Sequence, residues 1–220
     1  VHRWISLAVA LQLLVWTGTG LFFAVVPIGR VRGADRVAEA APGRIPWERV
    51  APLPAAALAG AEEVVLRVVD GRPVILAREG GRRWALDAAT GAEVSFDAPA
   101  AERIARADQR GSPPAVAVRR VEEAPVEYRG HPVPAWRVDL EDDRGTRVYV
   151  DAATGAVTAR RNGLWRVYDF LWSLHIMDYD AREDFNHPWL AALAALGIAT
   201  SLSGGAIWMT RAARAARSRS

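Results

Sequence analysis

Two long apolar stretches near the ends of the chain constrain its architecture more than any other feature. The stretches from Trp4 to Ile28 and from Pro188 to Thr210 contain no Asp, Glu, Lys, Arg or His. At about 1.5 Å of rise per residue, each is long enough to cross a hydrocarbon core of about 30 Å as a helix. The sequence therefore predicts two membrane helices that hold one soluble segment of roughly 160 residues on one side of a membrane.

The distribution of charge predicts the orientation of these helices and argues against nucleic acid as a partner. All 25 carboxylates lie between Asp35 and Asp184, so the segment between the helices is slightly acidic although the sequence pI is about 9.9. The excess positive charge is at the ends of the chain, at Arg3 and at the Arg residues after Thr210. Basic flanks favour the cytoplasmic side of a membrane, whereas a nucleic-acid-binding domain gathers basic residues on one folded face. We expect both termini in the cytoplasm and the central domain on the outer side of the membrane.

The first stretch carries two alternative interpretations. Arg30, Arg32 and Arg36 follow it closely and favour the opposite orientation for this helix, but the basic tail after the second helix contains no acid and outweighs them. The stretch is also compatible with a secretory signal peptide. Its length, and the lack of a small-x-small cleavage site near Ile28, favour a retained anchor.

Composition divides the chain into seven segments. They are a first membrane helix at 1–29, a linker at 30–53, a first repeat at 54–98, a second repeat at 99–162, an amphipathic interfacial helix and connector at 163–187, the second membrane helix at 188–210, and a basic cytoplasmic tail at 211–220. The chain has no Cys, which excludes disulfides, thiolate nucleophiles and cysteine-ligated metals within it.

The two predicted repeats share one identical hexapeptide, Asp-Ala-Ala-Thr-Gly-Ala, at 87–92 and 151–156. Each copy follows an apolar strand, and its Gly can adopt the positive φ that closes a turn. The turn residues are Asp87, Thr90, Gly91, Asp151, Thr154 and Gly155. Short helices are expected at Pro54–Gly60 and Pro99–Ala107, and Asp70-Gly71 predicts a hairpin. The expected fold class is α+β, with two membrane helices flanking a short helix plus a small antiparallel sheet, twice.

The repeated strand–turn–strand motif resembles the PepSY domain, and the copy from Ala135 to Ala159 is the closer match. The first helix, and the run from Trp165 to His175 followed by Asp184-Phe-Asn-His-Pro, resemble the membrane segments that accompany PepSY domains. The resemblance implies a membrane-anchored protein whose outer domain binds or modulates a protein or peptide, because PepSY domains are associated with protease propeptides and inhibition. Larger relatives carry four or more membrane helices, whereas two are predicted here.

Some PepSY membrane proteins resemble haem-bearing ferric reductases, so the resemblance also implies haem b as a possible cofactor. The candidate ligands are His2, His175 and His187, which flank the membrane segments. His2 and His187 belong at opposite ends of a span of about 30 Å and cannot share one iron. His175 and His187 are expected on the same side, and like residues of two chains could pair in a dimer. His131, in a turn, is interpreted as an ordinary surface residue.

A strongly aromatic helix is predicted immediately before the second membrane segment. Trp165, Tyr168, Trp172 and His175 are spaced to line one face of it. Aromatic residues with polar groups favour the boundary between membrane and water, which makes this segment a candidate interfacial helix in contact with lipid. The alternative is an ordinary amphipathic helix packed on the PepSY sheet.

No catalytic or dinucleotide motif is found, so a binding protein is favoured over an enzyme. The acidic segment Asp178–His187 has oxygen and nitrogen ligands for a metal, but helix capping by Asp180 and Glu183 is the simpler interpretation, and no metal is assigned. Small residues recur every fourth position at Ala191, Ala195, Ala199 and Ser203, where another helix can approach closely and a homodimer is possible. The expected function is partner binding, and the alternative is a haem-associated redox subunit.

Overall fold

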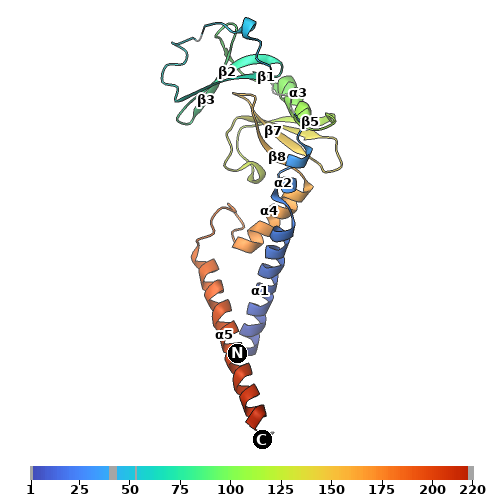
Figure 1. Ribbon diagram of the computed structural model, residues 1–220, viewed down its shortest axis with the longest axis vertical. Coiled ribbons are helices and arrows are strands. Elements are labelled where there is room, and N and C mark those ends of the chain that lie inside the picture. The colour runs from blue at the N-terminus through green and yellow to red at the C-terminus, as the bar shows by residue number, and fades with distance from the viewer. Residues whose placement is uncertain (1, 40–43, 53, 218–220) are drawn as a thin grey trace. The chain divides into compact units, whose positions relative to one another are not determined.

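The computed structural model describes residues 2–39, 44–52 and 54–217, without the side chains of His2, Arg3 and Ile5. These residues form two compact units, which are described separately (Figure 1). The helical unit consists of the residues up to Ile28 together with those from Val167 onward, and the central unit runs from Gly29 to Arg166. Two apolar terminal helices flanking two antiparallel sheets confirm the predicted α+β class.

The helical unit contains two helices that are long and apolar enough to cross a membrane, α1 (His2–Val25) and α5 (Pro188–Arg217). They pack against each other, and the contact is close at Gly197, where an added Cβ would lie 3.3 Å from Leu13. At about 1.5 Å per residue, α5 is about 45 Å long, so it extends beyond a hydrocarbon core of about 30 Å. The basic segment predicted as a separate tail is therefore helical as far as Arg217.

Two details of the helical unit differ from expectation. The predicted row of small residues is exposed in the single chain and does not face α1, since the face of α5 toward α1 contains Leu190, Leu193, Ala194 and Gly197. Contact of that row with a second chain stays a prediction. The acids after Met177 do not form the expected capping box at Asp180. The side chain of Asp178 instead accepts the backbone N–H groups of Asp180, Glu183 and Asp184.

The central unit contains two four-stranded antiparallel sheets, each in sequential strand order. The first sheet comprises β1 (Glu63–Val69), β2 (Arg72–Glu79), β3 (Arg82–Asp87) and β4 (Glu93–Val94). The second comprises β5 (Ala115–Val121), β6 (Ala135–Leu140), β7 (Arg147–Asp151) and β8 (Val157–Arg161). Helix α3 (Ala98–Asp108) lies between them in sequence, and α4 (Gly163–Ile176) follows β8. The shorter elements are α2 (Ile28–Val31) and the single 3-10 turns η1 (Ala34–Arg36), η2 (Trp47–Arg49) and η3 (Val126–Tyr128).

Local sequence explains the main elements of the central unit. Asp70 and Gly71 both have positive φ, 50° and 74°, as a two-residue hairpin between twisted strands requires. Helix α3 begins where the Asp97 side chain accepts the N–H of Ala100 at 2.9 Å, which satisfies one of the free donors of the first turn. Ala101 and Ala105 on its buried face pack against the second sheet (Figure 1).

The helix expected at Pro54–Gly60 is a series of hydrogen-bonded turns instead, with bonds such as Ala57 N–H to the carbonyl of Pro54 at 2.9 Å. A segment this short lacks the length that helix propagation needs, and Gly60 ends it with a φ of 84°. The described part of the expected linker belongs to the central unit and makes specific contacts within it. Asp35 of this segment pairs with Arg144 at 2.9 Å, and the N–H of Ala38 donates to the carbonyl of Asp108.

Candidate functional site

The two copies of the repeated hexapeptide form turns with corresponding hydrogen bonds, and in the first copy Asp87 also accepts the N–H of Thr90. Oδ1 of Asp87 and Oδ1 of Asp151 each accept the N–H two residues ahead at 2.8 Å. Gly91 and Gly155 have φ values of 73° and 68°, and each donates its N–H at 2.8 Å to the carbonyl of the Asp that begins its turn. The positive φ explains why Gly occupies its position in both turns, and the hydrogen bond that the carboxylate accepts explains why Asp begins them.

The surroundings of the two turns differ sharply. Asp87 is partly exposed, whereas Asp151 is 1% exposed and its carboxylate accepts Nη1 of Arg83, from the first sheet, at 2.6 Å. The N–H of Phe96 donates to the carbonyl of Ala152 at 2.8 Å. A Cβ on Gly155 would lie 2.7 Å from Val69. The second turn is therefore the joint between the two sheets.

A groove of about 760 Å³ opens beside this joint. It lies between the first sheet, helix α3 and the residues that follow the second turn. A smaller hollow of about 370 Å³ shares Arg67 and Leu76 with it and continues along the same face of β1. Together they form one depression, the β1 groove, lined among others by Val65, Arg67, Leu76, Arg103, Ile104 and Val157. Its lining combines aliphatic side chains with guanidinium groups.

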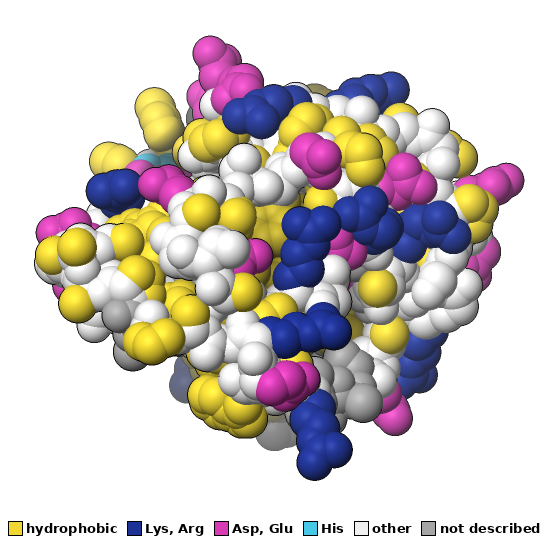
Figure 2. Space-filling view, turned by 90° about the horizontal axis from the view of Figure 1, so that it is seen from above, with side chains coloured by type: hydrophobic (Ala, Val, Ile, Leu, Met, Phe, Trp, Pro, Cys, Tyr) yellow, Lys and Arg dark blue, Asp and Glu magenta, His cyan; other side chains and the backbone are white. Residues whose placement is uncertain are grey.

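Four Arg line the β1 groove, and three of them pair with carboxylates of the chain. Arg78 pairs with Glu63, Arg83 with Asp151, and Arg103 with Asp70. Within the described residues, Arg67 has no hydrogen-bond or ion-pair partner, and it lies where the groove and the smaller hollow meet. Arg and acidic side chains are interspersed among hydrophobic ones on the face seen in Figure 2. Arg67 thus supplies a positive charge that no described residue pairs with, in a depression that also contains aliphatic side chains and the carboxylates of Glu63, Asp70 and Asp108.

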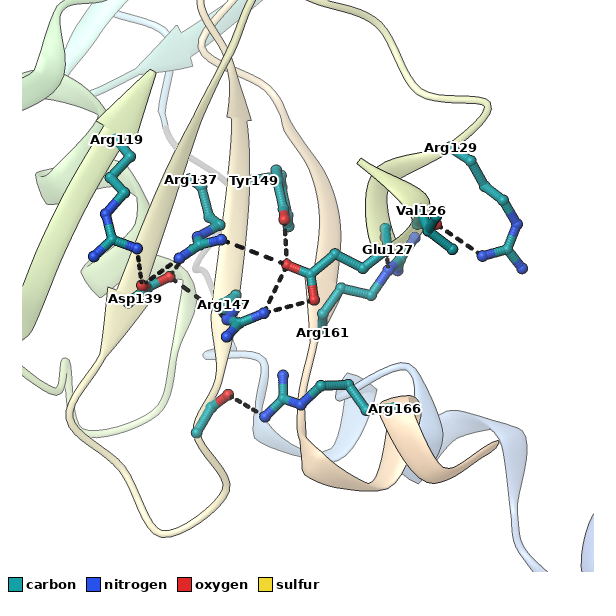
Figure 3. A network of polar contacts seen from close by, with 11 residues as sticks. Arg119, Val126, Glu127, Arg129, Arg137, Asp139, Arg147, Tyr149, Arg161 and Arg166 are labelled. Atoms are coloured by element: carbon teal, nitrogen blue, oxygen red, sulfur yellow. Dashed lines mark hydrogen bonds and ion pairs between the residues drawn. The ribbon is translucent and has the colours of Figure 1, made fainter. Parts of the chain in front are cut away.

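The opposite face of the second sheet carries a polar network that the sequence did not indicate (Figure 3). Glu127 accepts a hydrogen bond from the hydroxyl of Tyr149 at 2.5 Å and from Arg147 at 2.8 Å. Asp139 pairs with Arg137 at 2.8 Å and with Arg119 at 3.5 Å. Because these carboxylates are already paired with cations of the chain, this face is a structural network rather than a vacant ionic site.

Aromatic rings stack beside this network. The rings of Tyr128 and Tyr149 are 4.2 Å apart and nearly parallel, and the ring of His131 lies 5.0 Å from Tyr128 on its other side. Burial, and then the hydrogen bond to Glu127, raise the pKa of Tyr149, and burial raises the pKa of Tyr128. Both hydroxyls therefore stay protonated and act as donors at neutral pH.

We predict that His131 destabilises the central unit when it becomes protonated. Burial, and then the charge of Arg161, lower the pKa of His131, and Nη2 of Arg161 lies 3.1 Å from Nε2 of the ring. A histidine whose pKa is lowered by folding leaves stability intact above about pH 6.5, and stability falls as the pH drops through the lowered value. NMR titration of His131 in the full-length protein should give a pKa below 6.5. In Arg161→Gln the pKa of His131 should rise toward 6.5, and an unchanged pKa would contradict the contribution assigned to the charge of Arg161.

His175 occupies an aromatic site on α4, within the helical unit. Its Nδ1 lies 2.8 Å from Oγ1 of Thr19 on α1, and the same hydroxyl lies 2.9 Å from the carbonyl of Val15. The ring packs against Trp16 and Phe23, with centroids 5.6 and 5.4 Å apart. If the Thr19 hydroxyl donates to the carbonyl, it accepts from Nδ1 of His175 and leaves Nε2 as the unprotonated nitrogen.

His187 does not complete a ligand pair with His175. Nε2 of His187 lies 2.7 Å from the carbonyl of Ile176, to which it donates, and Nδ1 accepts the N–H of Leu190 at 3.3 Å. Nδ1 thus caps the first turn of helix α5, a role that the sequence did not reveal, and Nε2 is engaged by the last residue of α4. The side chain of His2 lies outside the described residues. Haem ligation by His175 stays a prediction.

The four residues predicted to line the interfacial helix have two kinds of surroundings. The rings of Tyr168, Trp172 and His175 all lie within 6 Å of the Phe23 ring of α1. Trp165, in the first turn of α4, instead lies under the guanidinium of Arg161 at 4.4 Å. The aromatic face from Tyr168 onward therefore packs on a membrane-length helix.

The acidic connector before α5 is organised by its own backbone. Several backbone N–H groups, those of Asp184 and Glu183 first among them, lower the pKa of Asp178 to about 2. Over residues 2–39, 44–52 and 54–217, no group of three or more His, Asp or Glu is placed to hold a metal ion.

The sequence matches one known family along its whole length. The family is described as the PepSY-associated TM region, and the match covers residues 1–220. No curated protein and no solved structure matches the chain.

Proposed function

The chain belongs to the PepSY-associated TM region family, and on this premise we propose that it is a membrane-anchored binding protein whose central unit holds a protein or peptide of the cell envelope. Membership and the two apolar helices make it a two-pass membrane protein. The proposal beyond that is that the central unit, with its two sheets as copies of one repeated PepSY-like unit, binds or modulates a partner.

The observation that carries this proposal is the β1 groove. Its larger part has a volume of about 760 Å³, and its lining combines aliphatic side chains with paired charged ones and with Arg67, which has no partner among the described residues. Ligand sites likewise combine apolar walls with polar groups that fix the orientation of the ligand. The face with Glu127 lacks these properties because its charges are already paired.

The proposal is tested by filling the groove in the full-length protein. Ala107 is an exposed residue of α3 that lines the groove, so Ala107→Trp should occupy it. Val116 is 64% exposed on β5 and does not line the groove, so Val116→Trp is the matched control. After chemical cross-linking in native cells, envelope proteins captured by the unchanged protein should be lost with Ala107→Trp and retained with Val116→Trp. Equal capture by all three forms would overturn the proposal.

We further predict that the central unit faces the periplasm of a bacterial inner membrane, with both termini in the cytoplasm. The basic residues at the end of α5 favour this orientation. Because the chain has no Cys, Arg72→Cys and Ala216→Cys each introduce a single thiol. A maleimide that cannot cross the inner membrane should label position 72 in spheroplasts, and position 216 only after the membrane is opened. The reverse pattern would contradict the orientation.

The aromatic helix α4 is proposed to lie at the membrane boundary. Its face with Tyr168, Trp172 and His175 packs on α1, while Val167 and Phe170 are 49% and 56% exposed. Exposed apolar side chains on a helix bound to a membrane-length helix are suited to contact with lipid.

A second candidate function, a haem b-associated subunit of a ferric-reductase-like redox system, rests on His175. Its Nδ1 is oriented by Thr19, as the second nitrogen of a ligating His usually is. Because His187 is engaged, the other axial ligand would come from a second chain. Purification in detergent with ample haem would then give a Soret band that is lost in His175→Ala and kept in His187→Ala. A colourless protein removes this candidate.

A further inference from the structure

We infer that the β1 groove takes its partner as an added β-strand, and that the strand carries a carboxylate that Arg67 binds. This inference rests on the proposed binding function and specifies the partner's chemistry as an extended acidic peptide segment. It assigns the backbone contacts to the outer edge of β1 and the charge contact to one guanidinium group.

The outer edge of β1 is open for hydrogen bonding. Among the described residues, β1 is the first strand in its sheet and pairs with β2 alone. In the two-residue hairpin, Val69 and Arg72 form the pair next to the turn, and Val69, Arg67 and Val65 exchange bonds with β2. The alternate residues therefore direct their N–H and C=O groups away from the sheet. These residues are Val64, Leu66 and Val68.

The position of Pro73 supports this assignment. It lies opposite Val68 in the register, and its carbonyl accepts the N–H of Ala88 at 3.1 Å on the far side, toward β3. Pro73 has no N–H to offer β1. Val68 thus belongs to the outward-directed set, and the free edge spans three donors and three acceptors.

The side chains along this edge suit a strand partner. Val64 and Val65 are 42% and 37% exposed, which is unusual for adjacent aliphatic residues of an edge strand. A seven-residue strand extends about 23 Å, and both depressions lie along it. A peptide added there pairs its backbone with β1 and places alternate side chains in the groove.

The charge of the groove specifies the acidic residue. Arg78, Arg83 and Arg103 are each paired within the chain, and Arg67 is not, among the residues that the structure describes. Its guanidinium offers a fork of donors that matches a carboxylate. An added strand antiparallel to β1 has residues directly opposite and diagonal to Arg67 on the same face, from which Asp or Glu reaches it.

The inference is tested with a displayed library of seven-residue peptides, selected against the full-length protein in nanodiscs. Enriched peptides should alternate β-branched residues with polar ones and contain Asp or Glu. Val64→Pro removes an N–H that points away from the sheet and leaves the hydrogen bonds between β1 and β2 intact. The selected peptides should therefore bind the Val64→Pro variant at least about fivefold more weakly than they bind the Val64→Thr variant. Arg67→Glu should lose about tenfold or more, whereas Arg72→Glu, outside the groove, should not.

The outcomes separate this inference from the proposed function. If Val64→Pro unfolds, the comparison of Arg67→Glu with Arg72→Glu still decides the charge contact. Enriched peptides without acidic residues, or equal binding to the paired variants, would overturn the inference. So would a concentration-dependent homodimer that Val64→Pro abolishes, because β1 would then pair with a second copy. In each case, partner capture that depends on Ala107 would leave the broader proposal standing.

Discussion

Replacing Asp151 with alanine is expected to destabilise the central unit by about 3 kcal/mol, the lower end of the range for breaking a buried ion pair. The carboxylate is 2% exposed and holds both Arg83 and the N–H of Ala153. Its loss leaves the guanidinium, 27% exposed, without its partner in the joint between the sheets. Hydrogen exchange of the full-length protein in nanodiscs, read at the slowest amides of β3 and β7, measures the change.

Asp87→Ala is the matched control for this prediction. Asp87 accepts the corresponding N–H of Ala89 and also that of Thr90 in the first copy of the hexapeptide, but no ion pair is found for it in the described residues. It should cost about 1 kcal/mol, the net value of an exposed hydrogen-bonded turn. Equal losses for the two Ala variants would show that the ion pair with Arg83 contributes nothing to the joint.

Gly155→Ala is expected to cost about 2–5 kcal/mol, from two additive causes. The residue has a φ of 68°, where a side chain costs about 1–2 kcal/mol. Its Cβ would also lie 2.7 Å from Val69 and 2.8 Å from the Phe96 ring, and such overpacking costs about 1–3 kcal/mol more. The same exchange measurement reports the effect.

Gly91→Ala separates the two causes. Gly91 has a φ of 73°, and among the described residues its Cβ would meet only Pro54, at 3.3 Å. It should therefore show the backbone cost of about 1–2 kcal/mol without most of the clash. If both Ala variants lost the same stability, the close approach of the second turn to Val69 and Phe96 would be contradicted.

Local patterns predicted much of this fold. Uninterrupted apolar stretches identified α1 and α5, because spanning length and lack of charge are properties of a segment alone. Asp70-Gly71 predicted the hairpin of β1 and β2, because the left-handed backbone restricts the residue types at such a turn. The turns at Asp87 and Asp151 were identified for the same reason.

The properties that depend on tertiary contacts were not available from the sequence. Two identical hexapeptides gave no indication that one would be buried against Arg83 and Phe96 while the other stayed exposed. The capping role of His187 depends on the carbonyl of Ile176 lying beside its ring. The β1 groove also arises from packing between elements distant in sequence.

The proposal that the β1 groove binds a partner is tested most directly by photo-cross-linking in the native cell. A photoreactive amino acid replaces Val65, which is 37% exposed in the groove, and in a separate strain Val116, which is 64% exposed on β5. Adducts with an envelope protein or peptide are expected at position 65 and not at position 116. Adducts at neither position, or equally at both, would contradict the proposal.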